Sequence, residues 1–385
     1  ELGIDYATIG NNEGIGLAKE ELDCLYEQAK FQPIIGNLKD EGRQPEWAKP
    51  YLIHKTKAGT KIAFLAYTFP YYITYAPNGW QVLEPMARLE EDLARPEVRD
   101  ADIVVVLSHL GVRYDEQIAE TYPQVNLVIG SHTHHLFEEG KLVDETYLAA
   151  ADRYGYYLGC IDLTVENGRW IECQIEAIPT KSYILDLDKE DETFIKAMRE
   201  EGHRRLAQKK VANLGRELDF DETCQLVLQA VCQETHSQLT LLNTGLIMKT
   251  LGPQVTMADL QEALPHQMRM ARLVVTGQEL KEICQEVFTK AELLKNQAIK
   301  GMGFRGKTFG EVITGNFAYK NGNLLYNRRV VDSNEKFSLV LVDQYYFASY
   351  FPTIKEKEVT LLFPDLLREL VSKYLGKNGA NWDKI

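Results

Sequence analysis

Histidines follow two apolar segments of this sequence and could bind a divalent metal ion. Residues 103–107 lead into Ser108 and His109, and residues 127–130 lead into the cluster Ser131-His132-Thr133-His134-His135. Short apolar runs of this kind predict buried strands. Neutral imidazole binds first-row divalent cations well, and strand ends hold side chains in fixed positions. We therefore predict that His109, His132 and His134 are metal ligands, whereas His135 is expected to point away.

A third polar segment, Gly10-Asn11-Asn12-Glu13, follows the short apolar run 6–9. The side-chain oxygen of Asn11 would be a weak ligand for a hard or borderline cation. Taken alone, two asparagines after a strand are more typical of a turn than of a metal site, because Asn tolerates left-handed backbone geometry. Together with the histidines, Asn11 predicts one metal site at the carboxyl edge of a sheet.

The elements around these residues alternate between strand and helix over residues 1–182. Residues 61–67 read as a buried strand and residues 84–93 as a helix that stops before Pro96. This order predicts an α/β domain built as a layered sandwich. Further on, Asn167-Gly168 lies between two apolar runs and predicts a β-hairpin.

Residues 183–210 are rich in charged residues and are interpreted as a linker helix. The alternative is an ordinary surface helix of one large domain. Residues 211–385 mix helical and hairpin patterns, which predicts a second, α+β domain. Its last helix is expected over 364–375, with Pro364 at the first position.

The composition of the 385-residue chain narrows the classes of function. A formal net charge of −13 disfavours a general nucleic-acid-binding protein, because the phosphate backbone attracts Lys and Arg surfaces. No apolar stretch approaches the roughly 18 residues of a membrane span. Six cysteines lie far apart without a CxxC pair, which favours buried free thiols in a reducing compartment and so a cytoplasmic protein. The oligomeric state is left open.

Three segments resemble the motifs of calcineurin-like metallophosphoesterases, in the same order and with similar spacing. They are Gly10-Asn11-Asn12-Glu13, Ser108-His109-Leu110-Gly111 and Gly130-Ser131-His132-Thr133-His134. The whole chain is similar to the bacterial 5′-nucleotidases. Its second half carries this resemblance through Asn243-Thr244-Gly245, Leu264-Pro265 and Thr276-Gly277-Gln278-Glu279-Leu280.

This resemblance implies a substrate and a cofactor. The reaction would be hydrolysis of a nucleotide phosphomonoester to a nucleoside and phosphate, as in nucleotide catabolism. The complete protein would hold two divalent ions (Mn, Zn or Mg) that neutralise the phosphoryl oxygens and lower the pKa of bound water. Carried over by motif, Asn11, His109 and His132 would bind one ion and His134 the other.

The chain departs from the family pattern in two places. The family's Asp-x-His and Gly-Asp-x-x-Asp motifs are expected to precede Glu1, so we expect the metal site of this chain alone to be incomplete or without metal. The family's catalytic imidazole position is occupied by Asn12. An amide cannot act as a general acid near neutral pH, although it can donate a hydrogen bond to a phosphoryl oxygen. Slower turnover or a different leaving group is therefore expected.

The second domain is expected to bind the nucleoside. The resemblance points to the following substrate-binding candidates: Asn243, Phe304, Arg305, Tyr346 and Phe347. Packing in the core is the alternative for each aromatic residue. The family's arginine shortly after Gly245 and its Gly-Gly-Asp motif are absent, so the base is not specified.

Two other functions remain open on the sequence alone. One is a 2′,3′-cyclic phosphodiesterase or nucleotide-sugar hydrolase that uses the same site. The other is a non-catalytic homologue that binds nucleotide or metal. A dinucleotide site at the G-x-G-x-x-G match of residues 301–306 is disfavoured, because a helical pattern precedes it and a strand-like run follows.

Overall fold

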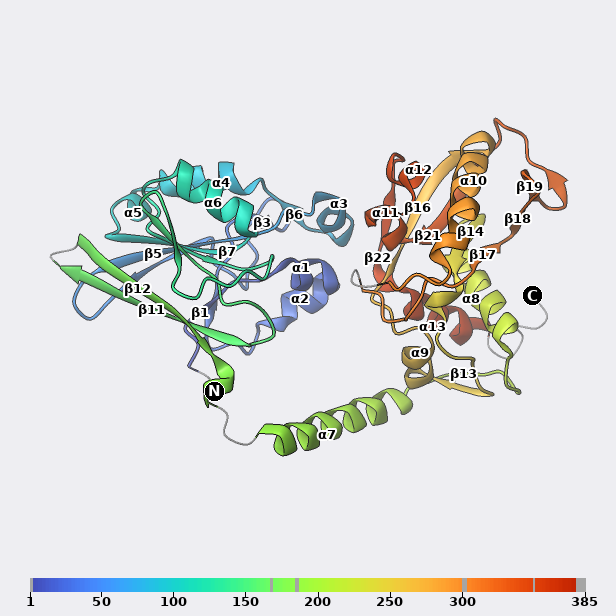
Figure 1. Ribbon diagram of the computed structural model, residues 1–385, viewed down its shortest axis with the longest axis horizontal. Helices are drawn as coiled ribbons and strands as arrows, with labels where there is room; N and C mark the ends of the chain where they lie inside the picture. The colour runs from blue at the N-terminus through green and yellow to red at the C-terminus, as the bar shows by residue number, and fades with distance from the viewer. Residues whose placement is uncertain (1–2, 167–168, 184–186, 300–302, 349, 379–385) are drawn as a thin grey trace. The chain divides into compact units, whose positions relative to one another are not determined.

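The chain divides into two units, Glu1–Leu187 and Asp188–Ile385 (Figure 1). The structure is a computed structural model that describes residues 3–166, 169–183, 187–299, 303–348 and 350–378. The predicted hairpin turn at Asn167-Gly168 lies outside the described residues. No helix in the described ranges is both long and apolar enough to cross a membrane.

A six-stranded sheet forms the centre of the first unit, in the order β4-β5-β7-β8-β10-β9. The four inner strands are parallel, and β4 and β9 pair antiparallel at the two edges. The strands are β4 Tyr51–Lys55, β5 Lys61–Thr68, β7 Ile103–His109, β8 Leu127–Gly130, β9 Lys141–Val143 and β10 Thr146–Ala149.

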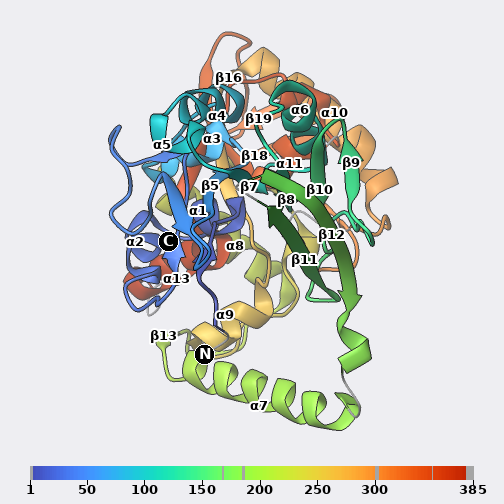
Figure 2. The same cartoon turned by 90° about the vertical axis from the view of Figure 1, so that its left-hand side faces the viewer.

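Alternate residues of the sheet pack against different layers. Val104 and Val106 face the cluster that includes α4 (Pro85–Leu93) and α6 (Val112–Thr121). Ile103 and Val105 face the hairpin of β11 (Tyr157–Glu166) and β12 (Arg169–Pro179), which crosses the opposite face of the sheet (Figure 2). This period of two in a parallel strand covered on both faces explains why the run 103–107 is apolar throughout.

A smaller apolar cluster beside the sheet holds the segment that carries Asn11. Ile9, Leu22, Tyr75 and Trp80 are among its buried residues. The elements that contribute to it are α1 Asn11–Gly16, α2 Lys19–Leu25, β3 Leu38–Lys39, α3 Tyr72–Tyr75 and β6 Gln81–Val82. The short strands β1 Tyr6–Ala7 and β2 Gln32–Pro33 pair with each other in parallel. Asn11 is the first residue of the short helix α1, whereas the alternative interpretation of the sequence was a turn. A further short helix, α5 (Pro96–Arg99), starts at the proline that was expected only to stop α4.

The second unit contains a five-stranded mixed sheet in the order β17-β14-β21-β16-β22. Its strands are β14 Leu239–Asn243, β16 Arg269–Thr276, β17 Val312–Gly315, β21 Lys336–Val342 and β22 Thr360–Leu366. The principal helices are α7 Leu187–Ala207, α8 Phe220–Glu234, α9 Met257–Ala263, α10 Gly277–Leu294, α11 Asp343–Phe347, α12 Pro352–Lys355 and α13 Leu367–Asn378. Two small sheets complete the unit: β13 Lys210–Asn213 with β15 Gln254–Thr256, and β18 Phe317–Lys320, β19 Asn323–Tyr326 and β20 Arg329–Val330.

Two expectations need correction here. The last helix starts at Leu367, because Pro364 belongs to β22 and the backbone N–H of Leu366 donates to the Glu369 carboxylate at the start of the helix. The six cysteines are free thiols, but Cys24 and Cys160 are exposed while the other four are buried.

The segment interpreted as a linker contains α7, whose apolar residues Phe194 and Met198 are exposed.

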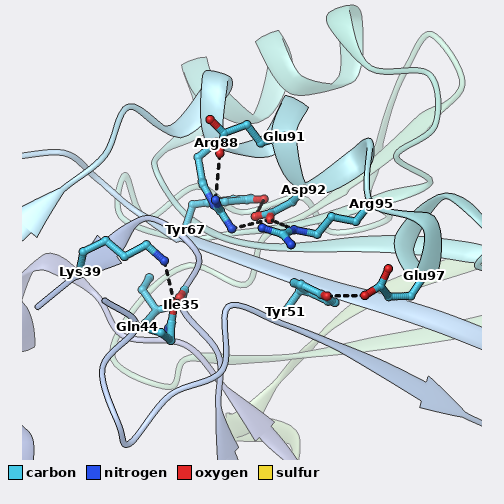
Figure 3. Close-up of polar contacts among 10 residues, drawn as sticks. All are labelled: Ile35, Lys39, Gln44, Tyr51, Tyr67, Arg88, Glu91, Asp92, Arg95 and Glu97. Carbon is cyan, nitrogen blue, oxygen red and sulfur yellow. Dashed lines mark hydrogen bonds and ion pairs between the residues drawn. The ribbon is translucent and has the colours of Figure 1, made fainter. Parts of the chain in front are cut away.

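A buried carboxylate fastens α4 to the central sheet. Asp92 accepts hydrogen bonds from Arg88 Nη2 at 2.6 Å, Arg95 Nε at 2.9 Å and the Tyr67 hydroxyl at 3.1 Å (Figure 3). Asp92 is fully buried and Arg88 is nearly so. Removing one partner from a buried ion pair leaves the other charge without compensation, which is far more costly than losing an exposed pair.

We predict that Asp92→Ala lowers the free energy of unfolding by about 3–5 kcal/mol. The matched control is Glu97→Ala, because the exposed Glu97 accepts a 2.8 Å hydrogen bond from the Tyr51 hydroxyl at the surface of the same region. Urea unfolding followed by circular dichroism compares the two variants. If Asp92→Ala lowered the free energy of unfolding as little as the control does, the hydrogen bonds of Asp92 would not stabilise the first unit.

Candidate active site

The carboxyl ends of β7 and β8 bring the predicted histidines together. The two strands are parallel neighbours, with Ser108 opposite Gly130 in the register. His109 is the last residue of β7, and His132 lies in the loop that follows β8. Asn11 arrives from the N-terminus of α1 and is buried.

The three side chains converge on a single atom. His109 Nε2 and His132 Nδ1 each lie 2.9 Å from Asn11 Oδ1. The two imidazole rings are 5.1 Å apart at their centroids and inclined by 64°. One amide oxygen and two imidazole nitrogens from three separate segments therefore face a common point.

The backbone around this point leaves little room for other arrangements. A Cβ at Gly10 would lie 2.6 Å from His109 Cε1, so only glycine allows the imidazole to approach so closely. The other ring nitrogen, His109 Nδ1, lies 3.0 Å from the Ser131 hydroxyl. This second contact orients the ring so that Nε2 points toward Asn11.

Burial keeps these imidazoles neutral at physiological pH. It lowers the pKa of His109 to about 4, and the nearby His132 and His134 add to the effect. The pKa of His132 is also lowered, first by burial and then by His134. A neutral imidazole retains the nitrogen lone pair that a cation needs.

His134 is near this group but does not share its central contact. It is exposed, with a left-handed backbone φ of 55°, and it influences both other histidines electrostatically. His135 is also exposed, and its Nδ1 lies 3.0 Å from the Thr133 hydroxyl. Asn12 is exposed beside Asn11, with its Oδ1 3.4 Å from Asn11 Nδ2.

The donor set around Asn11 fits one borderline divalent cation, because imidazole nitrogen and amide oxygen both suit such ions. The described part of the chain has no group of three or more His, Cys, Asp or Glu side chains able to hold a metal. The described residues thus offer three donors for one ion and no carboxylate among them. They do not by themselves assemble the second ion's site.

The candidates on the second unit differ in exposure. Asn243 is buried, and both ends of its amide are used internally: Oδ1 accepts from the Tyr345 hydroxyl at 2.7 Å, and Nδ2 donates to the Phe309 carbonyl. Phe304 is only 5% exposed and stacks on His266, with centroids 4.8 Å apart. In this structure the Asn243 amide is hydrogen-bonded at both ends, and the buried Phe304 ring is packed against His266.

The remaining three candidates are accessible. Arg305 is exposed, and its Nη2 donates to Gln267 Oε1 at 3.1 Å. Tyr346 and Phe347 are partly exposed and form an edge-to-face pair with centroids 5.3 Å apart. These side chains can still contact a ligand.

Sequence reasoning missed a buried acid behind the histidines. Asp115 on α6 is 4% exposed, and its carboxylate accepts a hydrogen bond from the Ser108 hydroxyl. A Cβ at Gly130 would lie 2.5 Å from Asp115 Oδ2, so the acid packs closely against the end of β8 as well. The sequence did contain a signal for this buried acid. Asp115 lies three residues before the apolar Ile118 and so falls on the apolar face of the helix.

Asp115 predicts a distinctive dependence of stability on pH. Burial raises its pKa from 3.8 to about 7. Between these values the folded protein binds more protons than the unfolded chain, so this group's contribution to stability falls as the pH rises from about 4 to about 7. The lowered pKa of His109 acts in the opposite direction, so the comparison must be made against a variant.

We expect Asp115→Asn, which keeps the shape and cannot ionise, to remove the Asp115 contribution. Urea unfolding at pH 5 and pH 8 measures it: the wild-type free energy of unfolding should fall relative to that of the variant as the pH rises. Parallel pH profiles for the two proteins would contradict the raised pKa.

Comparisons with known proteins give this site a context. No protein-family model matches the chain. The uncharacterised metallophosphoesterase YunD of Bacillus subtilis is 34% identical over 392 residues, which covers 96% of this chain and 84% of YunD. The trifunctional nucleotide phosphoesterase YfkN of the same species is 20% identical over 216 residues, covering 49% of this chain and 14% of YfkN.

Two solved structures share the fold along most of the chain. The NAD nucleotidase of Haemophilus influenzae has a TM-score of 0.59 at 13% identity, covering 98% of this chain and 82% of its own. A candidate 5′-nucleotidase from Staphylococcus aureus, in complex with alpha-ketoglutarate, has a TM-score of 0.58 at 14% identity, covering 98% and 81%. These likenesses confirm the predicted fold, a layered α/β sandwich followed by a second α+β domain.

The similarity to YunD, a metallophosphoesterase, extends over 96% of this chain at 34% identity. The protein therefore belongs to the metallophosphoesterase family of phosphoric ester hydrolases.

Proposed function

We propose that the protein hydrolyses nucleotide phosphomonoesters to a nucleoside and phosphate. The observation that carries this proposal is the meeting of His109 Nε2 and His132 Nδ1 at Asn11 Oδ1. The nucleotide class is favoured because YfkN and both solved neighbours are described as nucleotide phosphoesterases or nucleotidases. The particular base is left open.

Asn11, His109 and His132 would hold one divalent ion, and the exposed His134 is the candidate ligand for a second in the complete protein. Such ions offset the charge of the phosphoryl oxygens and lower the pKa of bound water. The lowered pKa values of His109 and His132 leave both rings unprotonated for this role. Gly10 and Ser131 fix the position and the tilt of the His109 ring.

Asn12 limits the chemistry that the chain itself can supply. Its exposed amide can donate a hydrogen bond to a phosphoryl oxygen but cannot protonate the leaving oxygen. General acid catalysis typically contributes 10²–10⁴-fold to a rate. Hydrolysis of a nucleotide phosphomonoester should therefore be slower than it would be with an imidazole at position 12.

On the second unit, the accessible residues Arg305, Tyr346 and Phe347 are the proposed contacts for the nucleotide. A guanidinium bound to neutral oxygens keeps its positive charge available for an anion. Partly exposed aromatic rings can stack on a base. Asn243 and Phe304 would act indirectly by supporting this surface.

We predict that His132→Ala in the full-length protein lowers Mn²⁺-dependent phosphate release from AMP by at least about 100-fold. Loss of a residue that merely supports a metal ligand already costs about 10–100-fold. His135→Ala is the matched control, since His135 is an exposed neighbour in the same loop, and it should keep wild-type activity. Full activity in His132→Ala would overturn the proposed role.

A panel of substrates tests which reaction the protein catalyses, independently of the role of His132. AMP, 2′,3′-cyclic AMP and a nucleotide sugar each give a different product on hydrolysis. Fastest turnover of AMP supports the proposal, whereas preference for the cyclic or sugar substrate would replace it with one of those activities. Nucleotide binding without hydrolysis at saturating metal would contradict it.

A further inference from the structure

Phe69 touches both central histidines, although it carries no chemistry of its own. It directly follows β5, so it reaches the same carboxyl edge of the sheet as His109 and His132. Its backbone N–H donates to the His109 carbonyl at 2.9 Å. Its ring stacks on the His132 imidazole, with centroids 4.9 Å apart and planes inclined by only 16°.

The position of Phe69 is itself firmly set. The preceding residue, Thr68, is fully buried, and Asn37 binds both of its backbone groups: Oδ1 accepts from the Thr68 N–H at 2.9 Å and Nδ2 donates to the Thr68 carbonyl at 2.8 Å. Tyr71 and Tyr114 pack around the Phe69 ring at centroid distances of 4.7 Å and 6.0 Å. The aromatic ring is therefore a fixed surface against which His132 rests.

His132 needs such a surface. Its backbone φ of 66° is left-handed, a conformation that a residue with a side chain rarely adopts unless its surroundings hold it there. Its loop is exposed on both sides, at Ser131 and Thr133. Without a neighbour on its face, the imidazole could turn about its bond to the backbone and move Nδ1 away from Asn11.

We propose that Phe69 is a positioning residue that holds the His132 imidazole with Nδ1 directed at the metal-binding point. This inference rests on the proposed function of His132 as a metal ligand. The stack should also favour the metal-bound state, because an imidazole that donates electron density to a cation is attracted more strongly to the electron-rich face of a phenyl ring.

The test makes the same substitution, phenylalanine to leucine, at two positions in the full-length protein, one within β5 and one directly after it. Phe69→Leu removes the stack, and Phe64→Leu removes a partly buried ring from β5 that packs toward the hairpin instead. Phe69→Tyr restores the ring as the conservative variant. Phe69→Met serves as a second ring deletion in case the leucine variant does not fold.

The first readout needs no metal. In protein with ¹³C-labelled histidine, the ring protons of His132, assigned by their loss in His132→Gln, should show an upfield ring-current shift. We expect this shift to disappear in Phe69→Leu and to persist in Phe69→Tyr and Phe64→Leu. Persistence of the shift in Phe69→Leu would overturn the inferred stack.

The second readout is Mn²⁺ affinity by calorimetry. Phe69→Leu should bind about threefold to tenfold more weakly, which is what one aromatic pair is typically worth, and Phe69→Tyr should recover wild-type affinity. Unchanged affinity in Phe69→Leu, or an equal loss in Phe64→Leu, would overturn the positioning role. Wild-type affinity in His132→Gln would instead defeat the proposed function, so the two failures are distinguishable.

Discussion

The candidate site depends on one constraint, the parallel pairing of β7 with β8. This pairing places Ser108 opposite Gly130, so that the residues following each strand emerge at one edge. The imidazoles of His109 and His132 then meet at the amide oxygen of Asn11, which a short helix brings from a separate apolar cluster. A slip of one residue in that register would turn His109 to the other face of the sheet.

The site combines groups whose ionisation changes the stability of the fold with pH in opposite directions. Burial disfavours the charged forms of His109, His132 and Asp115, so these two imidazoles stay neutral and the pKa of Asp115 is raised. His132 and His134 both have left-handed backbones, which cost free energy in the folded state. Two neighbours support this region without being metal-ligand candidates: Asp115 contacts Ser108 and packs against Gly130, and Phe69 stacks on His132.

The parts predictable from sequence were those with a clear period and clear ends. The apolar run 103–107 and the run before Ser131 identified two strands, and the histidines at their ends followed directly. Pro364 misled the prediction of the last helix, because strand β22 continues past it to Leu366 and the helix begins only at Leu367. Phe304 and Asn243 matched motifs, but a motif does not say which partners a side chain meets, and both are occupied within the core. Asp115 and Phe69 were not predicted, because the contacts of Asp115 with Ser108 and of Phe69 with His132 form only in the folded chain.

The most direct measurement is the location of a bound ion in crystals of the full-length protein soaked with Mn²⁺, found from its anomalous scattering. The account predicts a peak in contact with Asn11 Oδ1, His109 Nε2 and His132 Nδ1. Strong peaks elsewhere, with these three atoms remaining in contact only with one another, would contradict it.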